Sequence, residues 1–79
     1  MNATINNMEL IFADFLSPDQ LMEDDIIKSP DGEMVTVKLI DATTNGWLIA
    51  AINDFGELIE FEVADDAVIS WYVYPTDED

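Results

Sequence analysis

The stretch that decides the fold is residues 34–63, MVTVKLIDATTNGWLIAAINDFGELIEFEV. Apolar and polar side chains alternate along much of it, and valine, isoleucine and aromatic residues are frequent, which is typical of β-strands with one buried face. Two turn signals interrupt the pattern, Thr44-Asn45-Gly46 and Asn53-Asp54-Phe55-Gly56. The stretch therefore predicts an antiparallel meander of three strands.

The same pattern continues on both sides of the meander. Ser29-Pro30-Asp31-Gly32 is a third turn signal. Further upstream, Ser17-Pro18-Asp19-Gln20 predicts a short helical turn, with Ser17 as N-cap and Gln20 closing a capping box, that ends near residue 23. Residues 8–12 are compatible with a short strand. The strands expected from these boundaries span residues 25–28, 34–42, 47–52, 57–63 and 68–74.

Loop lengths predict the register of the meander. A two-residue loop at Asn45-Gly46 places Leu39 opposite Ile52, and a four-residue loop over residues 53–56 places Ile52 opposite Glu57. The buried face predicted from these registers consists of Val35, Val37, Leu39, Leu48, Ala50, Ile52, Ile59, Phe61 and Val63. The opposite face then carries Lys38, Ile40, Trp47, Ile49, Ala51, Leu58, Glu60 and Glu62.

Length and composition indicate one small folded domain. The chain has 79 residues, of which 49% are hydrophobic, too many for an intrinsically disordered chain. We expect a single domain over residues 8–75, a flexible N-terminus at 1–7 and an acidic tail at 76–79. The fold class expected is mainly β: a five-stranded antiparallel barrel or roll with one short N-terminal helical turn.

Residues 21–41, LMEDDIIKSPDGEMVTVKLID, carry a resemblance to a known fold family. This stretch resembles the opening of small SH3-like β-barrel domains, including short phage and bacterial accessory proteins. In those domains a leucine and a Gly-Asp pair precede an isoleucine and a glycine-containing turn. Leu21, Asp25, Ile27 and Gly32 occupy those places, and Asp24 stands where glycine is usual. The resemblance implies an SH3-like barrel, a fold that hosts many unrelated functions.

The charge of the chain excludes several classes of partner. Eighteen Asp and Glu residues face only two Lys and Arg residues, which gives a net charge of −16. This argues against direct binding to nucleic acid or to anionic membranes, because both need basic side chains. Basic proteins, cations or a salt-rich cytoplasm are left. The longest apolar run, residues 47–52, is far too short to span a bilayer, so we expect a cytoplasmic protein, in the host cytoplasm if it is phage-encoded.

Catalytic chemistry has little support in the residue types present. Histidine, cysteine and arginine are absent, which removes the commonest general base and the strongest nucleophile. Glu60 and Glu62 project side by side from one strand, about 6.6 Å apart, and do not face each other across a substrate. The acidic runs 23–25 and 65–66 lack the spacing of a calcium loop. We expect no enzymatic activity, no cofactor and no dedicated metal site.

Two sets of residues are candidates for binding a partner. The first is acidic and lies within thirteen residues without a lysine: Asp54, Glu57, Glu60, Glu62, Asp65 and Asp66. The second is apolar: Phe55 at a turn tip, and Trp47 and Ile49 on the strip that Glu60 and Glu62 border. The alternative for the acids is a solvated strand face. For the strip, the favoured interpretation is that residues 8–16 cover it as part of the core.

Three functional hypotheses follow. The leading one is a non-enzymatic acidic interaction module, of the kind found in phage accessory proteins, that binds a basic nucleic-acid-binding host protein, with nucleic-acid mimicry as one form of this binding. The second is an SH3-like adaptor or structural protein that binds a peptide or an assembly through the aromatic strip. The third is an acidic domain of a salt-adapted organism. The oligomeric state stays open.

Overall fold

In the computed structural model, which describes residues 10–75, the chain forms one antiparallel sheet with almost no helix. Its strands are β1 (Ile11–Leu16), β2 (Ile26–Lys28), β3 (Met34–Ala42), β4 (Gly46–Ile52), β5 (Leu58–Ala64) and β6 (Ile69–Val73), and its one 3₁₀ helix is η2 (Pro18–Gln20). The mainly β prediction is confirmed, with six strands in the sheet and not five. Strands β2 to β6 agree with the predicted ranges to within a residue. Strand β1 begins later than the strand predicted at 8–12, whose first two residues lie outside the described part of the chain. The flexible ends proposed at 1–7 and 76–79 also lie outside it.

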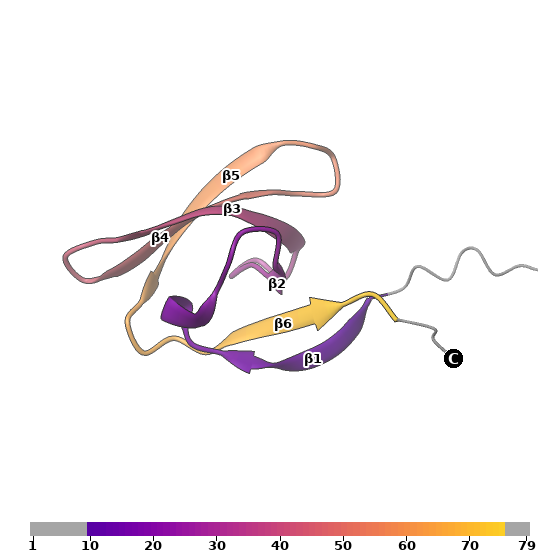
Figure 1. Cartoon of the computed structure of the whole chain (residues 1–79). Helices are drawn as coiled ribbons and strands as arrows, with labels where there is room; N and C mark the ends of the chain where they lie inside the picture. Colours follow the sequence, from indigo (N-terminus) through magenta and orange to yellow (C-terminus); the bar gives the residue numbers. More distant parts are fainter. Residues whose placement is uncertain (1–9, 76–79) are drawn as a thin grey trace, which may run out of the picture.

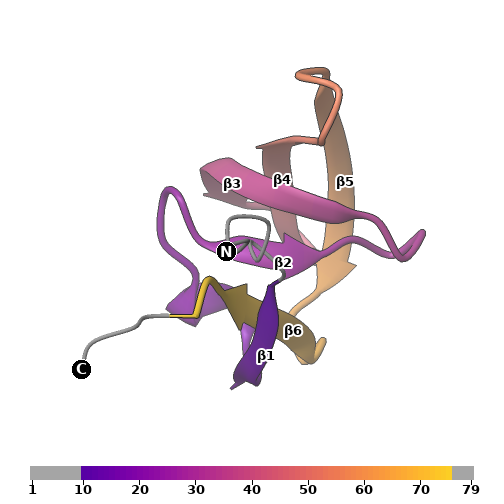
Figure 2. The ribbon, with the colours of Figure 1, turned by 90° about the vertical axis from the view of Figure 1, so that its right-hand side faces the viewer.

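The sheet is strongly bent, with strand order β1-β6-β2-β3-β4-β5. The hairpins of β3, β4 and β5 form one layer, and β6 and β1 cross on the other side of the core (Figures 1 and 2). The short strand β2 pairs with both β3 and β6 and so joins the two layers. Within residues 10–75 the outermost strands, β1 and β5, do not pair with each other, so the sheet stays open.

The core lies between the two layers. Its most buried members come from three strands: Ile27, Val35, Val37, Ile49 and Ala51. Ile59, Phe61 and Val63 of β5 pack against them, as predicted from the alternation in this strand. Each fully buried Ile or Val contributes about 1.5–3 kcal/mol relative to an exposed position, a large share of the stability available to so small a domain.

The predicted inner face of β4 is wrong. Ile49 and Ala51 face the core, and Leu48 and Ile52 face outward with Ala50 between them. The cause is the loop before β5, which has three residues and not four: Asn53 N–H donates to the Glu57 carbonyl at 3.0 Å, and Gly56 takes a left-handed φ of 78°. Ile52 therefore pairs with Leu58 and not with Glu57. A shift of one residue exchanges the two faces of a strand.

The predicted pairing of Leu39 with Ile52 is also wrong. The chain reverses over Thr44-Asn45, since Thr43 N–H donates to the Gly46 carbonyl at 2.7 Å. A β-bulge between Val37 and Leu39 then changes the phase of β3, so that Val37 stays buried while Leu39 lies opposite Ala50 and is 56% exposed.

Gly46 is needed for a close approach of two strands and not for turn geometry. Only Gly32, Gly56 and Asp24 have positive φ within residues 10–75. A Cβ placed on Gly46 would overlap the carbonyl oxygen of Val63 in β5. The glycine therefore permits the β4–β5 pairing at its far end.

The segment between β1 and β3 is held by capping and turn hydrogen bonds. Gln20 Oε1 accepts from Ser17 N–H at 2.9 Å, which is the Gln20 half of the predicted capping box. The helix ends at Gln20, earlier than predicted, because Leu21 is extended and buried in the core. Asp24 adopts φ 79°, a conformation that glycine takes most readily, and its N–H donates to the Val37 carbonyl at 2.8 Å.

We predict that Gly46→Ala lowers the free energy of unfolding by about 2–3 kcal/mol, because the new methyl group must push β5 away. Gly56→Ala is the comparison: no atom lies within 4 Å of its Cβ position, so only the left-handed φ is penalised, by about 1 kcal/mol. Urea denaturation measures both. Equal losses would show that β5 does not constrain position 46.

We predict a ranking of stabilities at position 24. Asp24→Gly removes the cost of the left-handed backbone and loses only an exposed ion pair with Lys38, so it should match or exceed the original chain. Asp24→Val should lose about 1–2 kcal/mol because a β-branched residue tolerates this φ poorly. Thermal unfolding checks the order, and a valine variant as stable as the glycine variant would contradict it.

Candidate functional site

The most distinctive surface is the outward side of the β3–β4–β5 layer, called the outer face below. It is made of Thr36, Leu39, Asp41, Leu48, Ala50, Ile52, Leu58, Glu60 and Glu62. In the register of the sheet, Leu39, Ala50 and Glu60 form one row, and Asp41, Leu48 and Glu62 form the next. Leu39 and Leu58 are 56% and 61% exposed. Apolar and acidic side chains thus share one solvent-facing surface.

Glu60 and Glu62 lie on this face beside Ala50 and Leu48, and not beside Ile49 and Trp47 as predicted. Both are exposed. Glu62 is positioned by a hydrogen bond from Thr43 Oγ1 to its Oε2 at 2.7 Å. In the described part of the chain the only ion pair joins Lys38 to Asp24, at 3.2 Å. The two glutamates therefore have no lysine to neutralise them there.

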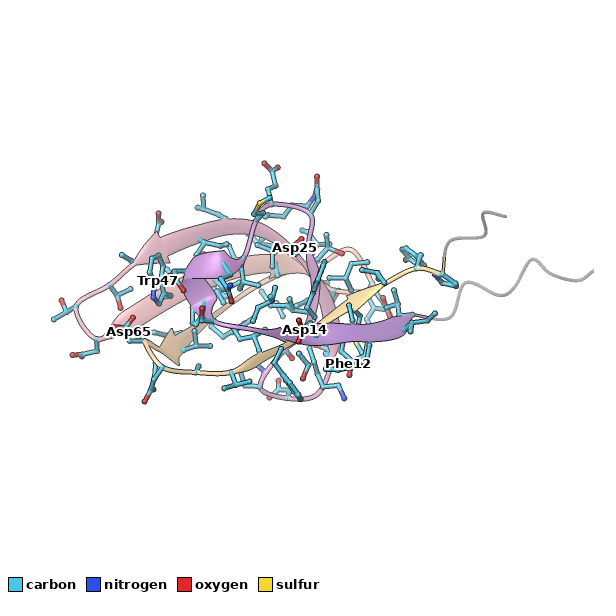
Figure 3. The ribbon with its side chains drawn as sticks, turned by 60° about the horizontal axis from the view of Figure 1, so that its bottom comes forward. Phe12, Asp14, Asp25, Trp47 and Asp65 are labelled. Carbon is cyan, nitrogen blue, oxygen red and sulfur yellow. The ribbon has the colours of Figure 1, made fainter. Side chains whose placement is uncertain are left out.

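Trp47 and Ile49 belong to the inner side of β4. Ile49 is completely buried, so it is a core residue and not a contact residue. Trp47 is partly buried, and its Nε1–H donates to Asp65 Oδ1 at 3.0 Å (Figure 3). Ile49 and Ala51 of this strip are core residues, as the favoured interpretation held, but the cover expected from residues 8–16 is mostly wrong. Of the described residues 10–16, only Leu16 packs against the core cluster, whose members include Leu21, Ile27 and Ile69.

The other predicted contact residues lie at the two ends of β5. At one end Asp54 and Phe55 occupy the loop tip, where Phe55 is 80% exposed, and Glu57 Oε1 accepts from Asn53 Nδ2 at 3.1 Å. At the other end Asp65 and Asp66 follow the strand. Seven residues of β-strand separate these ends by about 20 Å. The structure therefore distributes the predicted set along a strand and does not gather it into one cluster.

An aromatic cluster on β1 and β6 was not predicted. The Phe12 ring lies 4.9 Å from that of Phe15 and 5.7 Å from that of Tyr72, and Lys28 Nζ is 5.6 Å from the Tyr72 ring centre. Phe12 and Phe15 are largely exposed. Residues three apart point to opposite faces of a regular strand, but a bulge between Phe12 and Asp14 brings both rings to one side. No pattern in the sequence marks that bulge.

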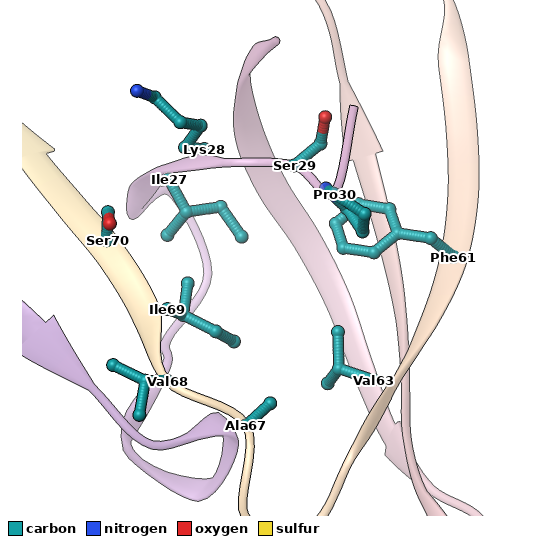
Figure 4. A pocket seen from close by; sticks show the side chains of 10 residues that line it. All are labelled: Ile27, Lys28, Ser29, Pro30, Phe61, Val63, Ala67, Val68, Ile69 and Ser70. Atoms are coloured by element: carbon teal, nitrogen blue, oxygen red, sulfur yellow. The ribbon is translucent and has the colours of Figure 1, made fainter. Parts of the chain in front are cut away.

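A pocket of about 320 Å³ opens between β5 and the opposite layer (Figure 4). Phe61 and Val63 project into it from β5, and Ile69 and Ala67 face them. The full lining is Ile27, Lys28, Ser29, Pro30, Phe61, Val63, Ala67, Val68, Ile69 and Ser70. The lining is mainly apolar, and the pocket lies where the open sheet leaves β5 without a second neighbour.

Other kinds of site find no support in residues 10–75. No group of three or more potential metal ligands is gathered there. No helix of this part of the chain is long and apolar enough to cross a membrane. Comparison of the chain with protein-family models, with curated proteins and with solved structures found no match. The function is therefore inferred from the surfaces described above.

We predict that Asp65→Ala lowers the free energy of unfolding by about 1 kcal/mol, because Trp47 loses the acceptor of its indole N–H. Asp65→Asn keeps an acceptor oxygen and should lose less. Asp66→Ala is the matched control, since it removes the neighbouring exposed carboxylate. Urea denaturation followed by tryptophan fluorescence tests the three variants, and an equal effect of the two alanine changes would refute a specific role of the Trp47 contact.

Proposed function

We propose that this protein is a non-enzymatic interaction module that binds a basic protein or peptide through its outer face. The observation that carries the proposal is that Glu60 and Glu62 stand exposed on the same surface as the exposed leucines 39 and 58. Apolar contacts surrounded by charged groups are the usual composition of a protein interface. The carboxylates would attract and orient a cationic partner, and the leucines would supply desolvated area.

The composition of the outer face argues against two explanations of the acidity that involve no partner. A solvated strand face, or a surface adapted to high salt, needs carboxylates but gains nothing from exposed leucines. Leu39 and Leu58 lose the burial that stabilises a small domain. Exposed leucines among acidic residues are therefore better explained by a partner that covers them.

Three further observations support finer forms of this proposal. Glu60 and Glu62 present regularly spaced negative charges along one strand, as a nucleic acid presents phosphates, so the partner we favour is a nucleic-acid-binding protein. The SH3-like roll is supported by the pairing of β6 back to β2 after the meander. A phage-type accessory role in the host cytoplasm rests on the resemblance of residues 21–41.

A second candidate function is an adaptor role. The strip around Trp47 does not support it, because that strip faces the core. The aromatic cluster of Phe12, Phe15 and Tyr72 does, because Phe12 and Phe15 are exposed and lie beside the partly buried Tyr72 on the other layer. Aromatic side chains are enriched among the residues that dominate binding energy. An adaptor that used this cluster would bind with little dependence on salt.

We predict that Glu60→Gln with Glu62→Gln weakens capture of the partner from a host lysate and lowers the salt concentration at which it elutes. The control is Asp31→Asn with Glu33→Gln, which removes the same charge from an exposed turn outside the outer face. Ionic attraction weakens as salt screens it, so the original chain should release the partner steeply with added NaCl. Single-stranded DNA should displace a nucleic-acid-binding partner. If the partner elutes from both double variants at the same salt concentration, the outer face is not the surface that binds it.

A further inference from the structure

The free edge of β5 is the feature that defines the partner more closely. Within residues 10–75, β5 pairs with β4 alone. Asn53 N–H donates to the Glu57 carbonyl at 3.0 Å, so the residues that bond to β4 are 57, 59, 61 and 63. The backbone N–H and C=O groups of Leu58, Glu60 and Glu62 are therefore directed to the open side. A row of unpaired backbone donors and acceptors is a template for another strand.

The two faces of this edge differ in chemistry. On the inner side Phe61 and Val63 line the apolar pocket, opposite Ile69 (Figure 4). On the outer side Glu60 and Glu62 are exposed and have no ion pair among the described residues. A strand laid along the edge would place alternate side chains into the pocket and beside the glutamates.

We propose that β5 receives an extended segment of a partner protein in which apolar residues alternate with Lys or Arg. The segment would pair with the backbone of Glu60 and Glu62, insert its apolar side chains into the pocket, and place its basic side chains beside the two carboxylates. Pairing with an exposed sheet edge is an established mode of peptide recognition, and cross-strand pairs of opposite charge stabilise it. This inference rests on the proposed function and adds the conformation and residue pattern of the basic partner.

A second copy of the chain is a poorer occupant of this edge. Antiparallel self-pairing about Phe61 would set Glu60 of one copy opposite Glu62 of the other. Like charges directly opposite each other destabilise a strand pair, and each chain carries a net charge of −16. The charge of the edge therefore favours a basic segment over self-association.

The test uses three synthetic seven-residue peptides with blocked ends. One alternates Lys and Val, the second has the same composition with all lysines before all valines, and the third alternates Glu and Val. Binding to the full chain is measured by titration, and hydrogen exchange of the Glu60 and Glu62 amides by NMR. The alternating basic peptide should bind about tenfold more tightly than the block peptide, since only it matches both faces, and should slow exchange of both amides.

Variants of the chain test separately how the outer and inner sides of the β5 edge contribute to peptide binding. Glu60→Gln with Glu62→Gln should weaken the alternating basic peptide about tenfold, whereas Asp31→Asn with Glu33→Gln should not. Val68→Asn changes an exposed side chain of the pocket lining and should weaken the same peptide while leaving the melting temperature unchanged. Protection of the Glu60 and Glu62 amides in each complex reports whether the backbone pairs.

Several outcomes would overturn the inference. Binding without slower exchange of the Glu60 and Glu62 amides, or equal binding of the block peptide, would mean that charge alone attracts the peptide; the proposed function would then stand and the added strand would not. Amides already protected in the peptide-free chain would show that the edge is occupied by the chain itself, or by a second copy if protection rises with concentration. If Glu60→Gln with Glu62→Gln affects the binding of neither the peptide nor the lysate partner, the proposed function fails as well.

Discussion

The pairing register of β4 and β5 is the constraint on which the rest of the structure depends. It is set in the three-residue loop, where the Asn53 side-chain oxygen accepts from Phe55 N–H at 2.9 Å and from Glu57 N–H at 3.0 Å. These bonds fix which residue of β5 opposes Ile52, and that pairing decides which face of β4 is buried. Ile49 and Ala51 of β4 consequently enter the core, and Leu48 and Ala50 lie beside Glu62 and Glu60 on the outer face.

The same register connects stability to binding. Because β5 alternates a core residue with a glutamate, the strand contributes to the core with one side and presents acidic groups with the other. Its far end is held by the hydrogen bonds Thr43 to Glu62 and Trp47 to Asp65. Charged residues on an edge strand ordinarily prevent pairing with other chains. In the proposed complex, Glu60 and Glu62 would favour pairing with a basic segment and disfavour pairing with an acidic one.

The fold could be predicted from the sequence wherever a regular pattern or a turn residue marks it. The bounds of β2 to β6, the Ser17-Pro18 helix start and the inward side of β5 follow from alternation and capping residues, whereas β1 lies at Ile11–Leu16 and not at 8–12. The faces of β4 and the outward position of Leu39 could not, because they depend on one residue of loop length and on a bulge that no residue type specifies. The exposed acids of the candidate site were predictable from composition. Their apolar neighbours and the Phe12–Phe15 cluster depend on pairing that only the structure shows.

The bulge in β3 gives the positions on either side of it different evolutionary freedom. Before it, Val35 and Val37 are confined to residues of similar volume, because both are enclosed by the core. After it, Leu39 is free of that steric limit, and only a partner would keep it apolar. In related sequences, variation at position 39 would therefore follow changes in what the protein contacts, while variation at position 37 would follow changes in the core alone.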